Sequence, residues 1–285
     1  MSGICFNTID AIAVSFGPGL VGSLLVGVET AKALAYALGK PLIAVNHLEG
    51  HIYSNWLESN SKSEIRNPKP KFPLIGLIVS GGHTDLILMR RHGDFKLLGS
   101  TLDDACGEAF DKVAKFLGLG YPGGPEIERV AQQFTVHSSQ FTVNLPRPMI
   151  GSSDFNFSFS GLKTAVVNEV KRQTTLRKFS AQANDKRREE IAYEFQKAVC
   201  DVLISKTVRA AKKYRVKSIA VGGGVAANNR LRSQLTVHSS EIGIPVYFPE
   251  KKFSVDNGAM IAAAAFYKNK TVDPLKLFAD SNLHF

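Results

Sequence analysis

The sequence predicts an α/β fold built on largely parallel sheets. Short runs of β-branched residues recur along the chain, and most are followed by a turn of small residues and then by apolar residues at helical spacing. Strands that alternate with helices are typical of parallel sheets. The 285 residues exceed the usual size of one domain, about 100–200 residues, so two domains are expected.

The first part of the chain shows this alternation clearly. We expect, in order, a strand at 9–16, a helix that ends near Gly39, a strand at 41–45 and a helix at 47–57. The polar, proline-containing segment 59–71 is typical of a loop or a domain junction.

The rest of the chain continues the pattern after two strands joined by a Gly-Gly turn. Segment 137–159 lacks periodicity and is expected to be irregular. The expected elements are strands at 74–80 and 84–89, helices at 107–117 and 127–133, two long helices broken near 173–185, a strand at 218–221, a helix from about 230, a strand at 246–248 and a helix at 257–269.

The composition excludes several classes of protein. Hydrophobic residues make up 44% and charged residues 21%, which is typical of a folded globular chain. We find no apolar run close to the ~18 residues of a spanning helix and no signal-peptide pattern, so we expect neither a membrane protein nor secretion. The three cysteines form no CxxC pair, which favours a reducing cytosol over a disulfide framework or a cysteine zinc site.

The formal net charge of +10 is concentrated in one stretch. Between Lys163 and Lys217 there are 15 Lys and Arg against 6 Asp and Glu. Such an excess can neutralise the phosphates of a nucleic acid. Helices with solvated, basic outer faces explain the charge equally well, so charge alone does not name the partner.

The segment HLEGH places His47 and His51 four residues apart. On a helix these imidazoles share one face, at the spacing needed to hold one divalent metal. Glu49 points away from that face, so the segment is not the HExxH motif of zinc proteases. Asp256, in SVDNGAM, is the candidate third ligand, and simple capping of the following helix is its alternative explanation.

Four glycine-rich turns stand out in the sequence: SFGPGLVG, VSGGHTD, YPGGP and VGGGVAANN. Glycines at strand ends let backbone N–H groups approach a phosphate, so four such turns favour a nucleotide cleft. Asp111, Glu128 and Asn228 lie near these turns and are candidates for hydrogen bonds to a nucleoside. Surface carboxylates and a turn-forming Asn remain the alternatives for these three residues. The adjacent Asp103 and Asp104 are not expected to act as a catalytic pair.

Eight motifs together resemble one family, the bacterial TsaD-type tRNA N6-adenosine threonylcarbamoyltransferases. They run in the family's order from about Asp10 to about Ala265: GPGLVGSLLVG, NHLEGH, VSGGHTDL, DDACGEAFDK, YPGGP, FSFSGLKTAV, VGGGVAANNRLR and DNGAMIAAAA. The resemblance implies the actin-like ATPase/sugar kinase/Hsp70 (ASKHA) fold, in which two related α/β domains enclose a nucleotide cleft. We expect residues 1–70 and 257–285 to form the first domain and residues 71–256 the second.

The resemblance also implies site residues. His47, His51 and Asp256 are expected to bind one divalent ion, Fe²⁺ or Zn²⁺. The loop expected under the acyl-phosphate part of the substrate consists of Ile78, Val79, Ser80, Gly81 and Gly82. The expected nucleoside contacts are Asp111, Gly124, Glu128 and Asn228. Many relatives have Asp at the position of Glu128, whose longer side chain keeps the acceptor but can shift the contact.

The activity implied by the resemblance is transfer of threonylcarbamoyl from threonylcarbamoyl-AMP to tRNA, at N6 of the adenosine beside the anticodon. The implied partners are tRNA, an actin-like paralogue of the TsaB type and a small P-loop ATPase of the TsaE type, in the cytoplasm and away from membranes. The alternative is a non-catalytic actin-like scaffold of the same complex, which has no need for His47, His51 and Asp256 together. A sugar or acetate kinase of this fold likewise gains nothing from HLEGH.

The sequence departs from the family at its start. Relatives open with a strand–turn–strand that carries an I-E-T-S-C-D-type motif, whereas Met1 lies just before the strand expected at 9–16. A sheet without those strands exposes apolar faces and unpaired edges. We expect either a truncated chain or a partner that completes the sheet, and we predict that the chain alone is poorly stable or inactive.

Overall fold

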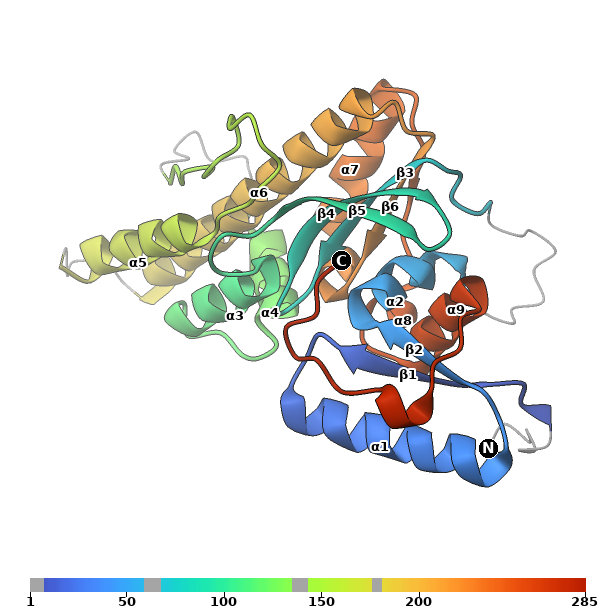
Figure 1. The fold of residues 1–285 in the computed structure, drawn as a ribbon. Helices are drawn as coiled ribbons and strands as arrows, with labels where there is room; N and C mark the ends of the chain where they lie inside the picture. The colour runs from blue at the N-terminus through green and yellow to red at the C-terminus, as the bar shows by residue number, and fades with distance from the viewer. Residues whose placement is uncertain (1–7, 59–67, 135–142, 176–180) are drawn as a thin grey trace.

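Five alternating layers of helices and sheets make up the computed structural model, which describes residues 8–58, 68–134, 143–175 and 181–285 (Figure 1). Helices α3–α7 cover one face of a five-stranded sheet, and α2 and α9 cover its other face. A two-stranded sheet packs on the far side of α2 and α9, and α1 closes the stack. The predicted α/β class is therefore confirmed.

The two-stranded sheet consists of β1 (Ile12–Gly17) and β2 (Leu42–Asn46), which pair in parallel with Ile12 opposite Leu42. Helix α1 (Val21–Leu38) is the crossover connection between these parallel strands. It packs on one face of the two-stranded sheet through Val28 and Ala35. Gly39 ends α1 in the left-handed conformation, at φ 63°, which explains the predicted helix end at this glycine.

The five-stranded sheet has the order β5-β4-β3-β6-β7. Its strands are β3 (Leu74–Val79), β4 (Thr84–Arg91), β5 (Asp94–Ser100), β6 (Ser218–Gly222) and β7 (Val246–Tyr247). Strands β3, β6 and β7 are parallel, but β3, β4 and β5 form an antiparallel meander. The expectation of largely parallel sheets is thus wrong for half of this sheet, because turns of a few residues join only antiparallel neighbours.

Strand β5 was missing from the sequence prediction. Its side chains are mostly exposed or half-buried at the edge of the sheet, so it lacks the apolar run that marks the other strands. The predictions also merged or omitted short elements, namely η2 (Ser54–Trp56), η3 (Gly224–Ala227), α8 (Lys251–Ser254) and η4 (Pro274–Lys276).

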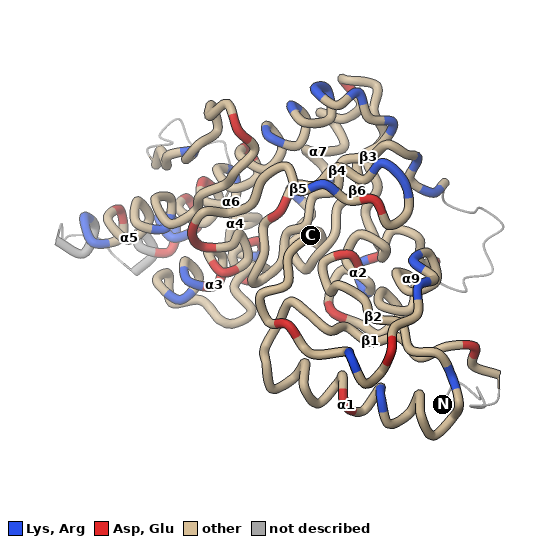
Figure 2. Tube along the Cα trace, in the orientation of Figure 1, with Lys and Arg blue, Asp and Glu red and all other residues tan. Residues whose placement is uncertain are grey.

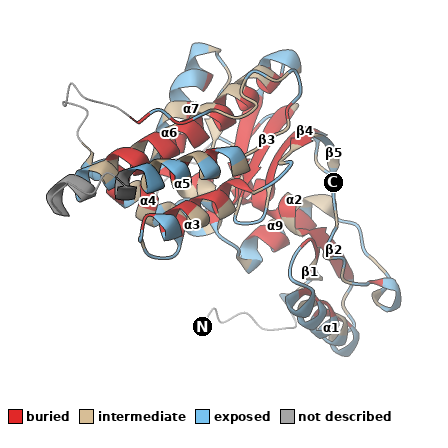
Figure 3. Ribbon diagram, turned by 90° about the vertical axis from the view of Figure 1, so that its left-hand side faces the viewer, coloured by how far each residue is buried: buried red, intermediate tan, exposed pale blue. Residues whose placement is uncertain are grey.

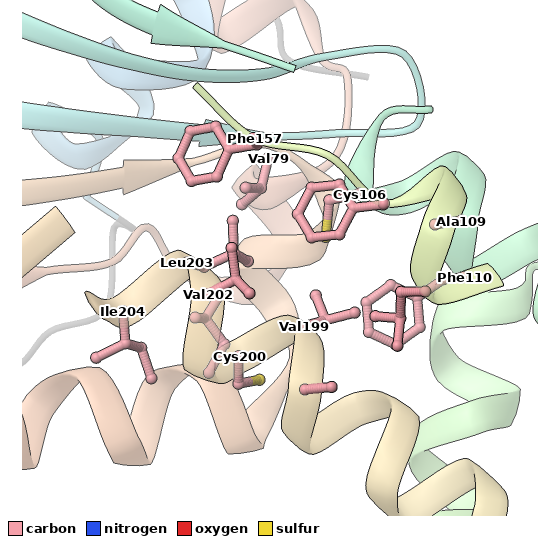
Figure 4. Packing of buried hydrophobic residues seen from close by; sticks show 14 of the residues in the cluster. Val79, Cys106, Ala109, Phe110, Phe157, Val199, Cys200, Val202, Leu203 and Ile204 are labelled. Carbon is pink, nitrogen blue, oxygen red and sulfur yellow. The ribbon is translucent and has the colours of Figure 1, made fainter. Parts of the chain in front are cut away.

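The outer helices enclose the largest apolar core. They are α3 (Cys106–Phe116), α4 (Gly123–Gln133), α5 (Ser160–Thr175), α6 (Ala181–Lys213) and α7 (Asn229–Glu241), close to the predicted helices. Phe110 faces Val199 in this core, where the two described cysteines, Cys106 and Cys200, are also buried as free thiols (Figure 4). Burial raises the pKa of the Cys200 thiol to about 12, so it acts as a small apolar side chain. Cys5 lies outside the described residues.

The middle layer consists of α2 (His47–Tyr53) and α9 (Gly258–Lys268). The two helices pack so closely at Gly50 that a Cβ there would lie 2.9 Å from the Ile261 Cδ1 atom. Leu48 and Ile52 of α2 join Met260 and Ile261 of α9 in a second core between the sheets. This middle layer carries the metal ligands predicted from the sequence.

Helix α1 is exposed over much of its surface (Figure 3). Its 18 residues are long and apolar enough, by length and composition, to cross a membrane. The expectation that no apolar run approaches this length is therefore wrong. Core helices of soluble proteins and signal sequences reach the same length and hydropathy, so these two properties are weak evidence for a membrane span. In this fold α1 buries Val28, Ala31 and Ala35 against the two-stranded sheet.

Candidate metal centre and nucleotide pocket

Helix α2 begins directly after β2 and carries both predicted histidine ligands. Asn46 caps the helix by accepting a hydrogen bond of 2.8 Å from the Leu48 N–H group. His47 and His51 then lie one turn apart with their ring centroids separated by 4.7 Å. His51 is 1% exposed and His47 is 22% exposed, so only His47 reaches the solvent.

Asp256 joins the two histidines from the segment before α9. Its Oδ1 atom lies 3.4 Å from His47 Nε2 and 3.3 Å from His51 Nε2. One potential ligand atom from each residue falls within 4.8 Å of the other two. The alternative that Asp256 merely caps α9 is wrong, because Asn257 caps that helix by accepting from the Met260 N–H group.

The electrostatics of this triad suit a divalent cation. Burial lowers the pKa of His51, so the imidazole stays neutral and keeps a lone pair for a metal. The contacts with His47 and His51 hold the pKa of Asp256 well below its usual range, so the carboxylate stays charged. Among the described residues neither buried ring nitrogen of His51 makes a hydrogen bond of good geometry, and Nε2 has only the 3.3 Å contact with Asp256. A metal ion would bind a His51 nitrogen together with a His47 nitrogen and an Asp256 oxygen.

Glu49 is turned away from the triad, as the sequence spacing predicted. Its Oε2 atom lies 3.5 Å from Lys268 Nζ, on α9. Burial raises the pKa of Glu49, an effect that Lys268 partly offsets. Glu49 therefore helps to join α2 to α9.

A pocket of about 290 Å³ collects five of the nine residues predicted to bind substrate: Gly81, Asp111, Gly124, Glu128 and Asn228. Its other lining residues include Val255, the immediate neighbour of Asp256. The candidate metal triad and the pocket are therefore neighbours, and the triad joins residues that are up to 209 positions apart in sequence, His47 and Asp256.

Three of these pocket residues also organise the backbone around it. The Asp111 carboxylate accepts a hydrogen bond of 2.7 Å from Gly123 N, at the start of α4. Glu128 accepts one of 2.9 Å from Asn229 N, at the start of α7. The Asn228 side chain caps α7 by accepting from Leu231 N. Each side chain is thereby held in place at the edge of the pocket.

The predicted loop Ile78–Gly82 divides into two parts. Ile78 and Val79 are fully buried at the end of β3, so their side chains do not reach the pocket. Ser80 closes the turn to β4: its N–H group donates to the His83 carbonyl, and its Oγ atom accepts from His83 N. Gly81 and Gly82 are exposed at the tip, and only Gly81 lines the pocket.

The apolar walls of the pocket were not predicted from the sequence. Phe110, Tyr121 and Val255 line it, and the Tyr121 side chain is exposed. Tyr121 opens the YPGGP turn, so an aromatic residue directly before a glycine-rich turn was the available signal. An exposed ring beside polar groups is able to stack on a base.

The FSFSGLKTA segment proves to be a helix start held by a distant carboxylate. Asp103 accepts hydrogen bonds from Phe159 N, Ser160 N and the hydroxyls of Ser158 and Ser160. Asp104 instead pairs with Lys112 and Lys163, at 2.7 and 2.6 Å. The two aspartates have different partners, as expected for residues that do not form a catalytic pair.

The basic stretch 163–217 is not one continuous patch. It runs along α5 and the 33-residue α6, which is about 50 Å long (Figure 2). Arg172 and Arg187 pair with Glu169, and Lys206 is fully buried beside Ser152. Several of the fifteen Lys and Arg side chains therefore stabilise the fold. Fewer of them are free to bind a nucleic acid than the sequence count suggests.

The fold and site define an α/β protein with a His-His-Asp group that could bind a metal ion, next to a pocket of about 290 Å³. Sequence comparison agrees, since the model of the TsaD family, described as tRNA N6-adenosine threonylcarbamoyltransferase, matches residues 1–263. The chain belongs to the TsaD family.

Curated relatives are similar over nearly all of this chain. The tRNA N6-adenosine threonylcarbamoyltransferase of Symbiobacterium thermophilum is 50% identical over 94% of this chain and 72% of its own length. That of Moorella thermoacetica is 47% identical over 99% of this chain and 78% of its own length. Among solved structures, T. kodakarensis HypF is similar with a TM-score of 0.63 over 92% of this chain and 40% of that chain. At 15% identity this likeness shows a shared fold alone.

Proposed function

We propose that this chain transfers the threonylcarbamoyl group from threonylcarbamoyl-AMP to N6 of the adenosine beside the anticodon, in tRNAs that read codons beginning with A. AMP is released. The observation that carries the proposal is the meeting of the His47–His51–Asp256 triad with the pocket lined by Asp111, Glu128 and Asn228, in a chain of the TsaD family.

The reaction is an acyl transfer from a mixed anhydride. The N6 nitrogen forms a bond to the carbamoyl carbon and loses a proton, while the bond from that carbon to the phosphate oxygen breaks and AMP leaves with the electron pair. An adenine amino group is a poor nucleophile, so positioning and charge stabilisation supply much of the rate. We assign the adenylate to the pocket, with Asp111, Gly124, Glu128 and Asn228 around the nucleoside and residues 78–82 near the acyl phosphate.

The metal is assigned to His47, His51 and Asp256, as Fe²⁺ or Zn²⁺. Two imidazoles and one carboxylate suit either ion and leave coordination positions open. The bound ion would supply positive charge that polarises the carbamoyl carbonyl or neutralises the departing phosphate. The protein contributes the neutral state of His51 and the charged state of Asp256, which follow from burial and from their mutual contacts.

We further assign the fold to the ASKHA class, with residues 1–70 and 257–285 as the first domain and 71–256 as the second. The packing of α9 and the C-terminal segment on α2 and the two-stranded sheet supports this division. The likeness to HypF supports the α/β fold but not the finer class.

The proposed partners are tRNA, an actin-like paralogue of the TsaB type and a P-loop ATPase of the TsaE type, in the cytoplasm. The exposed apolar side chains of α1 and of the residue before it, Leu20, Val26 and Tyr36, offer a face for the paralogue. The alternative, a non-catalytic scaffold, gives no reason for an intact metal triad beside the pocket.

A single-turnover assay tests the proposal. The metal-loaded chain is mixed with threonylcarbamoyl-AMP, unmodified tRNA and TsaB-type and TsaE-type partners, and the digested nucleosides are analysed by mass spectrometry. We expect threonylcarbamoyladenosine from the wild type and none from the Asp256→Asn variant. A chain that binds metal and threonylcarbamoyl-AMP but gives no product would favour the scaffold.

A further inference from the structure

The turn between β4 and β5 inserts a histidine into an aromatic cluster on the middle layer. His92 lies at this turn and contacts four rings: Tyr53 of α2, Trp56 of η2, Phe72 just before β3 and Tyr267 of α9. In Figure 1 the turn lies over α2 and α9. One side chain from the turn of the five-stranded sheet thus contacts both α2, which carries two of the proposed metal ligands, and α9, which follows the third.

The geometry of these contacts is specific. The His92 ring is stacked on Tyr267 at a centroid distance of 4.0 Å and an interplanar angle of 9°. Phe72 meets the same ring edge-on at 4.7 Å. The Tyr53 hydroxyl accepts a hydrogen bond of 3.2 Å from Gly93 N and lies 3.4 Å from His92 Nδ1. Stacking and hydrogen bonding therefore fix the turn in both distance and orientation.

The same rings hold α2 and α9 to each other. Tyr53 and Tyr267 stack at 5.4 Å with an interplanar angle of 10°. Tyr53 lies two residues after His51 on α2, whereas Tyr267 lies at the end of α9 far from Asp256. The triad needs ligand atoms from both segments within 4.8 Å, so any rotation or slide of one helix against the other separates them.

Strand β4 connects this contact to the pocket. His92 follows one end of β4, and the Ser80–His83 turn, which carries the pocket residue Gly81, precedes the other end. A strand paired on both sides is a stiff connection, and β4 pairs with β3 and β5 along its length. The contacts of His92 with α2 and α9, at the end of β4, thus influence where the proposed metal ligands lie relative to the pocket.

We infer that His92 is a positioning residue for the metal centre: its stacking on Tyr267 and its contact with Tyr53 hold α2 and α9 in the spacing that the His47–His51–Asp256 triad requires. The inference rests on the proposed metal site. In this role His92 does not bind the metal itself but orients the residues that do.

Metal affinity is the appropriate readout, because it does not depend on transfer activity. Zn²⁺ affinity is measured by competition with a chromophoric chelator, well below the melting temperature, for the wild type, His92→Ala and His92→Phe. His238→Ala, at an exposed histidine of α7, is the matched control. The absorption spectrum of the Co²⁺ form reports the ligand geometry in each variant.

We expect His92→Ala to weaken Zn²⁺ binding about 10-fold and to alter the Co²⁺ spectrum, since orienting groups contribute about 10- to 100-fold in affinity. His92→Phe, which keeps a stacking ring, is expected to restore most of the loss, and His238→Ala to have no effect. A lower melting temperature of the His92→Ala apoprotein with unchanged affinity and spectrum would overturn the inference and leave His92 a packing residue. A wild type that binds no metal would remove the proposed metal site itself, and this inference with it.

Discussion

Gly222, the last residue of β6, packs directly against the backbone of His51. A Cβ atom on Gly222 would lie 2.4 Å from the His51 carbonyl oxygen and 2.7 Å from its carbonyl carbon. Real Cβ atoms do not approach a backbone so closely, so only glycine permits this contact. The end of β6 therefore lies against the backbone of a proposed metal ligand.

The Gly222→Ala variant is expected to displace His51 and thereby weaken metal binding. Overpacking at a rigid backbone also costs about 1–3 kcal/mol of unfolding free energy. Gly224→Ala is the control, because nothing lies within 4 Å of a Cβ at that position. Chelator competition and urea unfolding of both variants measure the two effects. Equal metal affinity in Gly222→Ala and the wild type would show that the contact does not position His51.

The Asp256→Asn variant should lose metal binding while keeping the fold. The amide preserves the shape of the carboxylate but removes the charge that attracts a cation, so we expect affinity for Zn²⁺ to fall by about 100-fold or more. The side chain is 75% exposed, so little packing is lost. Glu241→Gln provides the matched control, since Glu241 is an exposed carboxylate of α7 that pairs with His238 and not with the triad. Comparable losses in both variants would argue against a ligand role specific to Asp256.

The Glu128→Ala variant should weaken the binding of AMP and lower stability together. It removes the acceptor of the Asn229 N–H group at the start of α7 and one polar wall of the pocket. Each lost hydrogen bond costs about 1 kcal/mol, so a decrease in AMP affinity of about 5- to 10-fold is expected by calorimetry. Glu126→Ala, on the same helix but paired with Arg129, should bind AMP normally. If both variants bind like the wild type, Glu128 does not contact the nucleotide.

The Asp103→Ala variant should destabilise the chain in a pH-dependent manner. Burial acts to raise the pKa of Asp103, but the hydrogen bonds from Ser158, Ser160 and Phe159 outweigh it, and the net pKa is lowered. A carboxyl whose folded pKa is depressed stabilises the protein above its unfolded pKa of about 4, and this stabilisation is lost as the pH falls through the folded pKa.

Urea unfolding at pH 7 and at pH 3 checks this sign. At pH 7 the variant should lose about 1–2 kcal/mol, as for other residues that cap a helix start, and the difference from the wild type should shrink at pH 3. Substitution of the exposed Asp10 by Ala serves as the control. A difference that stays constant between the two pH values would mean that the charge of Asp103 does not hold α5.

Several features of this protein were determined by the sequence alone. The alternation of strands and helices predicted the α/β class and most element positions, because hydrophobic periodicity depends on local geometry. The spacing of His47 and His51 predicted a shared metal face, since residues four apart on a helix always lie on one side. Glycine-rich turns predicted a nucleotide cleft, and five of the nine predicted substrate residues line one pocket, whose ligand stays a prediction.

The tertiary structure alone decided the remaining features. No local pattern showed that Asp256 faces His51 rather than capping α9, that Glu128 reaches the start of α7, or that His92 stacks between two helices. The contacts of Asp256 and Glu128 join residues about 100 to 200 positions apart in sequence. His92 lies on an edge hairpin whose strand β5 has no apolar run by which to predict it. Local sequence sets the periodicity of each element, whereas the packing of whole layers sets which side chains meet. The His47–His51–Asp256 triad depends on that packing.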